Sequence, residues 1–91
     1  MDASEIKEMK RRKSILQAEL FDLKKFIESV NQEKDKLRDR LCEYRSRQHF
    51  CDYEEEIEEA EYQIRQIERK LAELQNEQIS LQRQIEYLPL S

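Results

Sequence analysis

The sequence has no glycine and no tryptophan, and its 91 residues include one proline and two cysteines. Glycine is the residue that tolerates positive φ in tight turns, so its absence argues against all-β and α/β domains and against a glycine-rich phosphate-binding loop. Two cysteines are too few for a disulfide scaffold, which favours a reducing compartment and a cytoplasmic location. No stretch approaches the roughly 20 apolar residues of a membrane span, and the first residues do not resemble a secretory signal.

What the sequence does contain is charge. Asp, Glu, Lys and Arg make up 42% of the chain, with a formal net charge of −4 at pH 7. A composition dominated by Glu, Lys, Arg, Gln, Leu and Ile is typical of long helices and coiled coils. The length allows one domain at most, since domains usually contain roughly 100–200 residues.

The apolar residues recur at alternating spacings of three and four, the heptad pattern of a coiled-coil seam. Of the 24 seam positions, 21 are apolar. The seam consists of Ile6, Met9, Lys13, Leu16, Leu20, Leu23, Ile27, Val30, Lys34, Leu37, Leu41 and Tyr44, followed by Phe50, Tyr53, Ile57, Ala60, Ile64, Ile67, Leu71, Leu74, Gln78, Leu81, Ile85 and Leu88. The pattern predicts an all-α coiled coil.

The two runs of the seam are out of phase by two residues, which rotates the stripe by about 200° on a helix of 3.6 residues per turn. A single straight helix would therefore carry its seam on nearly opposite faces. Asp52 and Glu55 also have the spacing of a capping box, which marks the start of a helix. We predict one coiled-coil module over residues 1–91, with long amphipathic helices at about 4–45 and 53–88 and a junction at about 46–52.

The charges of the two halves favour an antiparallel arrangement. Residues 1–47 carry 13 basic and 10 acidic side chains, whereas residues 48–91 carry 4 and 11. A hairpin turning near residue 47 would place Leu41 opposite Tyr53. It would also place Arg45 beside Glu54 and Arg38 beside Glu61, because e positions face each other in antiparallel pairs.

Two other arrangements are compatible with the same heptads, an antiparallel dimer and a parallel dimer. The parallel dimer would gain attractive pairs such as Glu19–Lys24 and Glu33–Arg38 between its g and e positions. It would also match the preference of two-stranded parallel coils for Ile at a and Leu at d. The sequence leaves the hairpin, the antiparallel dimer and the parallel dimer open.

A lone two-helix seam has no second layer to bury, so we expect association with a second copy, as a dimer, with another helical protein, or with both. The predicted oligomer core consists of Leu16, Leu20, Leu23, Ile27, Val30, Leu37, Leu41, Ile57, Ile64, Ile67, Leu71, Leu74, Leu81 and Ile85. Ile15, Phe21 and Phe26 lie off the seam and make the segment around them apolar on several sides. Because exposed aromatic residues often mark contacts, these three are the candidate partner contacts.

Nothing in the sequence predicts chemistry. Cys42, His49 and Cys51 lie close together, but a structural zinc site needs four ligands at a different spacing. His49 has no nucleophile or pocket-forming element beside it, so we predict no enzyme activity, catalytic residue, metal or cofactor.

The basic run Lys10–Lys13 precedes a leucine repeat and resembles the basic region and zipper of bZIP proteins. It lacks the long basic extension that fills a major groove, and the acidic total would repel phosphate. The sequence therefore predicts a non-catalytic oligomerisation and protein-interaction module of a scaffold, adaptor or tether protein of the cytoskeleton or membrane traffic. The alternatives are a parallel rod that binds nucleic acid through its basic segment and a hairpin effector of a small GTPase.

Overall fold

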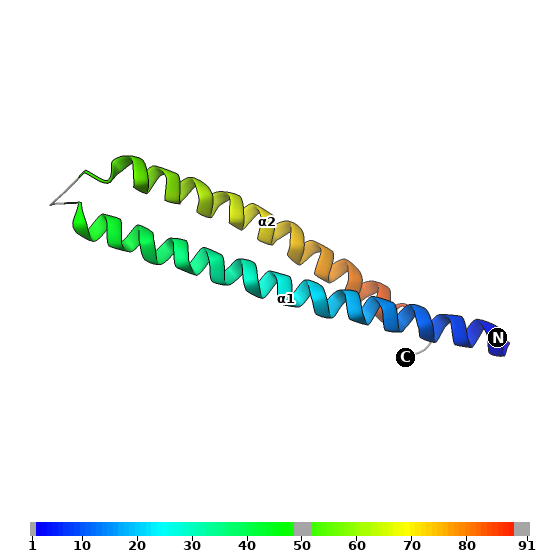
Figure 1. Ribbon diagram of the computed structural model, residues 1–91. Helices are drawn as coiled ribbons and strands as arrows, with labels where there is room; N and C mark the ends of the chain where they lie inside the picture. Colours follow the sequence, from blue (N-terminus) through cyan, green and yellow to red (C-terminus); the bar gives the residue numbers. More distant parts are fainter. Residues whose placement is uncertain (1, 49–51, 89–91) are drawn as a thin grey trace. The chain divides into compact units, whose positions relative to one another are not determined.

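The computed structural model describes residues 2–48 and 52–88, and in this part of the chain the regular structure consists of two α-helices (Figure 1). Helix α1 spans Ala3–Arg47 and has 45 residues, and helix α2 spans Glu54–Glu86 and has 33. The described residues contain no strand. The all-α fold class predicted from the sequence is confirmed.

The helices lie close to the predicted spans. The spans 4–45 and 53–88 differ from α1 and α2 by one or two residues at each end. An unbroken helix through the junction is excluded, because α1 ends before the junction and α2 begins after it. That residues 1–91 act as one module stays a prediction.

The start of α1 is capped by Asp2. The Glu5 backbone N–H donates to Asp2 Oδ1 at 2.8 Å, and the Ile6 N–H donates to the Asp2 carbonyl oxygen at 3.2 Å. The first N–H groups of a helix have no partner within the helix, so an Asp side chain at this position stabilises it. Glu5 adds negative charge to the first turn, where the helix dipole favours it.

The start of α2 uses an aspartate in a slightly different way. The predicted capping box has Asp52 as the capping residue and Glu55 as the third helical residue. In the structure the Ile57 N–H donates to the Tyr53 carbonyl oxygen at 2.9 Å, and the Glu54 N–H donates to Asp52 Oδ1 at 3.0 Å. Tyr53, not Asp52, is therefore the residue directly before the helix. The Asp52 side chain accepts a hydrogen bond from the N–H of Glu54, the first helical residue, as Asp side chains do in local turns.

The two helices divide into two compact units. The junction unit comprises Glu28–Glu73, and the terminal unit comprises Met1–Ile27 together with Leu74–Ser91. Each unit contains one stretch of α1 and one stretch of α2, so each has its own share of the seam.

The core of the junction unit is a small cluster between antiparallel stretches of α1 and α2. Leu41, Ala60 and Ile64 are buried together, and Leu37 and Ile57 pack against them. Ala60 is the smallest of these residues and leaves room for the larger Leu41 and Ile64. Within this unit the chain forms a helical hairpin.

The register of this hairpin differs from the predicted one by one heptad. Leu41 packs with Ala60, whereas the prediction placed it opposite Tyr53, seven residues earlier. The prediction paired the seam residues as if the turn were centred on residue 47. Because α1 ends at Arg47 and α2 begins only at Glu54, the connection moves the facing residues along α2 by seven positions.

Candidate protein-interaction surface

The side chains predicted as an oligomer core face inward along the seam. The buried ones are Leu16, Ile27, Val30, Leu41, Ile64 and Leu71, and the half-buried ones are Leu20, Leu23, Leu37, Ile57, Ile67, Leu74, Leu81 and Ile85. Every described seam position is buried or half-buried, and outside the seam only Glu61 and Gln82 of the described residues are so. This burial occurs within one chain, so the role of these residues in an oligomer stays a prediction.

Among the described residues of the junction unit, ion pairs connect Arg45, Arg38 and Lys34 of α1 to Glu61 and Glu68 of α2. Arg45 Nη2 lies 2.7 Å from Glu61 Oε1. Glu68 Oε1 forms ion pairs with two side chains, Arg38 Nη2 at 3.6 Å and Lys34 Nζ at 3.8 Å. The Lys34 side chain is 18% exposed, so its aliphatic part fills a seam position while its ammonium reaches the carboxylate. These pairs place the basic stretch of α1 beside the acidic stretch of α2.

The predicted pairs between e positions were wrong in register, but they correctly joined an arginine of α1 to a glutamate of α2. Arg45 pairs with Glu61 rather than Glu54, and Arg38 pairs with Glu68 rather than Glu61. Both partners are shifted by seven residues, in agreement with the shift of the core. The same heptad position recurs every seven residues, so the e positions still face each other.

The three candidate partner contacts are exposed, and all belong to α1 in the terminal unit. Ile15 is 53% exposed, Phe21 58% and Phe26 45%. The Lys25 ammonium lies 4.4 Å from the centroid of the Phe21 ring, a cation–π contact that leaves much of the ring accessible.

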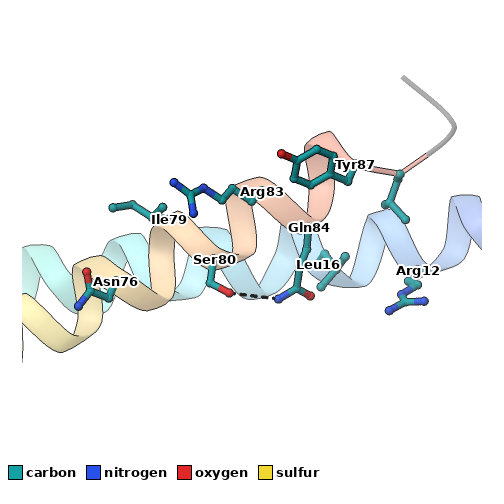
Figure 2. A pocket seen from close by; sticks show the side chains of 9 residues that line it. Arg12, Leu16, Asn76, Ile79, Ser80, Arg83, Gln84 and Tyr87 are labelled. Carbon is teal, nitrogen blue, oxygen red and sulfur yellow. Dashed lines mark hydrogen bonds between the residues drawn. The ribbon is translucent and has the colours of Figure 1, made fainter.

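A groove runs between α1 and α2 in the terminal unit (Figure 2). Its volume is about 640 Å³, and its lining includes Arg12 and Leu16 from α1, Ile79 and Arg83 from α2, and Tyr87 directly after the end of α2. Figure 2 shows Ile79, Arg83 and Tyr87 in a row along the C-terminal end of α2 and the turn that follows it. The groove thus combines apolar side chains with two guanidinium groups, and none of the described residues that line it is acidic.

A second hollow continues this surface along α1. It is lined by Met9, Arg11 and Ile15 and shares Arg12 and Leu16 with the groove. The candidate contact Ile15 therefore lies beside the groove. The hollow also includes the acidic residues Glu5 and Glu8, whereas none of the described residues that line the groove is acidic.

Sequence reasoning missed most of the groove. Ile79 and Tyr87 occupy outer heptad positions, where they look like scattered apolar residues, although they are 46% and 83% exposed. The available signal was the spacing of Ile79, Arg83 and Tyr87, each four residues apart and therefore on one face of a helix. Arg12 lies within the basic run Lys10–Lys13, and its place beside α2 cannot be seen in the sequence.

The structure supplies no geometry for chemistry at the residues that were considered for it. Cys42 is exposed, whereas His49 and Cys51 lie outside the described residues. In residues 2–48 and 52–88 no group of three or more His, Cys, Asp or Glu side chains could hold a metal ion. None of the described helices is long and apolar enough to cross a membrane.

Two long helices with a heptad seam and an exposed apolar and basic face define a helical-bundle module with coiled-coil packing. The comparison of sequences agrees with this class. Residues 4–88 match the family described as WIT1/2, N-terminal helical bundle, and the chain belongs to that family. A bundle of this type is not an enzyme fold, and it points to a helical protein-interaction module. No curated protein matches the chain significantly. No solved structure matches it significantly.

Proposed function

We propose that the chain is a non-catalytic module that joins a scaffold, adaptor or tether protein to a second copy of itself and to other helical proteins. The setting we propose is the cytoplasm, at the cytoskeleton or in membrane traffic, where the exposed thiol of Cys42 stays reduced. The homodimer is the form in which the module acts.

The observation that carries this proposal is the exposure of Ile15, Phe21 and Phe26 on α1. These side chains lie off a seam whose described positions are already buried or half-buried within the chain. Burying a Phe or Ile side chain contributes about 1.5–3 kcal/mol, so a partner that covers these residues gains a substantial free energy of association.

The charges support the terminal unit as the self-associating part. Residues 1–27 and 74–91 carry 8 basic and 7 acidic side chains, whereas residues 28–73 carry 9 and 14. Two terminal units, each with a net charge of +1, repel each other far less than two junction units, each with a net charge of −5. Repulsion between like net charges favours a contact through the terminal unit.

The test is the double variant Phe21→Ser/Phe26→Ser, studied by sedimentation equilibrium over a range of concentrations. We expect a dimer for the unchanged chain and a dissociation constant raised at least tenfold for the variant, because about 1.4 kcal/mol of lost contact changes affinity tenfold. Helicity by circular dichroism should be unchanged, since both side chains are exposed.

Tyr62→Ser is the matched control, because Tyr62 is an exposed aromatic residue of the junction unit. It should leave the mass distribution unchanged. If the variant Phe21→Ser/Phe26→Ser dimerises as strongly as the unchanged chain, Phe21 and Phe26 do not belong to the dimer contact. If the unchanged chain is still a monomer at high concentration, the proposal that it forms a homodimer is wrong.

A further inference from the structure

We infer that the groove of the terminal unit binds an acidic amphipathic helix of a partner protein. The inference rests on the proposed function and names the partner's chemistry. The partner helix places apolar side chains against the exposed Ile79 and Tyr87, and its carboxylates face Arg12 and Arg83.

The geometry of α2 suits a helical partner. Ile79, Arg83 and Tyr87 follow one another at four-residue intervals, which on a helix rising 1.5 Å per residue is about 6 Å per step. Figure 2 shows the resulting row, with Arg83 between an aliphatic and an aromatic side chain. A second helix presents side chains at the same spacing, so an apolar–acidic–apolar row can match it position by position.

The charge of the groove is complementary to carboxylates. Arg12 and Arg83 are exposed, and neither has an ion-pair partner among the described residues. The polar residues between them are neutral, and two of them bond to each other, with Gln84 Nε2 donating to Ser80 Oγ at 3.4 Å. A guanidinium group binds a carboxylate through two parallel hydrogen bonds, which gives orientation as well as affinity.

The apolar part of the groove distinguishes a protein helix from a nucleic acid. Ile79 and Tyr87 flank Arg83 and are both largely exposed. Covering them excludes water from the arginine contacts, which strengthens those contacts. A phosphate backbone would engage the two guanidinium groups but leave the aliphatic side chains in water.

The experiment uses the full chain and a fluorescein-labelled synthetic helix of about five turns. The probe has Leu at the facing positions and Glu at the flanking ones, and a second peptide carries Lys in place of each Glu. By fluorescence anisotropy, we expect the acidic peptide to bind at least tenfold more tightly than the basic one. The double variant Arg12→Glu/Arg83→Glu should bind the acidic peptide with an affinity at least tenfold lower than that of the unchanged chain. It should bind the basic peptide more tightly than the unchanged chain does.

A matched variant, Arg65→Glu/Arg69→Glu, makes the same charge change on exposed arginines of the junction unit. It should bind the acidic peptide within about twofold of the unchanged chain. An equal loss in both double variants would show a general charge effect and overturn the inference. The double variant Ile79→Ser/Tyr87→Ser should lower the affinity for both peptides. A purely electrostatic contact would not produce this loss.

Two further outcomes would also overturn the inference. The first is competition by duplex DNA at equal phosphate and carboxylate concentrations, which would identify the groove as a nucleic-acid site. The second is no binding of the acidic peptide to a chain that dimerises through Phe21 and Phe26. In that case the groove inference fails and the proposed function stands. If Arg12→Glu/Arg83→Glu loses the peptide and keeps the dimer mass, the groove is a separate partner site.

Discussion

The junction unit and the terminal unit share the same two helices and the same heptad seam, but the junction unit buries more of its seam side chains. The junction unit buries Val30, Leu41, Ala60, Ile64 and Leu71, whereas the terminal unit buries Leu16 and Ile27 and leaves its other seam residues half-buried. The difference teaches that a continuous heptad pattern does not imply uniform packing.

Particular residues account for the difference. The junction unit has a small residue, Ala60, in its core and ion pairs from Glu61 and Glu68 to α1. The terminal unit has polar residues at two seam positions, Lys13 and Gln78, and exposes Ile15, Phe21 and Phe26. The better-packed unit therefore stabilises the fold, and the other carries the candidate contacts.

The largest effect should come from a charge in the junction core. Ile64→Asp removes a buried side chain and leaves a carboxylate against Leu41 and Ala60. We expect a loss of about 4 kcal/mol in the free energy of unfolding, together with loss of assembly. Urea unfolding followed by circular dichroism measures it. Gln66→Asp, at an exposed position two residues away, should cost no more than about 0.5 kcal/mol, and an equal loss in both would contradict the assigned core.

The same change in the terminal unit should have a smaller effect on stability. Leu23 is half-buried, so Leu23→Asp should cost about 2 kcal/mol, the free energy of exposing an apolar side chain. Sedimentation equilibrium should show the dimer lost as well. The control is Gln17→Asp on the exposed face of α1. A destabilisation as large as that of Ile64→Asp would remove the difference between the units.

The smallest effect should come from the ion pair of Arg45 and Glu61. A double-mutant cycle with Arg45→Ala and Glu61→Ala should give a coupling free energy of about 0.2–1 kcal/mol, because the pair is partly exposed. Raising the salt concentration should reduce this coupling through screening. Zero coupling at low salt would show that the pair does not help to set the register of the junction unit.

The sequence was sufficient for the helical class and for the position of the break. Absence of glycine, two out-of-phase runs and the capping spacing of Asp52 and Glu55 point to two helices, and the structure has them. The register was not accessible in the same way. Heptad positions repeat every seven residues, so a shift that moves Leu41 from Tyr53 to Ala60 preserves every apolar match. Only the position of the turn along the chain distinguishes the two registers.

The groove was beyond sequence reasoning for another reason. A heptad assignment sorts residues by their distance from the seam, and Ile79 and Tyr87 fall on outer positions. Their relation to Arg12 depends on which stretch of α1 lies beside α2, which is a property of the folded unit. Exposed arginines also look alike in a sequence in which 42% of residues are charged.

The central claim is that the junction unit is the stable part of the fold and the terminal unit is the open part. Amide hydrogen exchange tests it directly, because exchange reports local opening segment by segment. In dilute solution, where no dimer forms, amides within residues 28–47 and 54–73 should exchange more slowly than those within residues 3–27 and 74–86. Equal protection in the two units, or slower exchange in the terminal unit, would contradict the account.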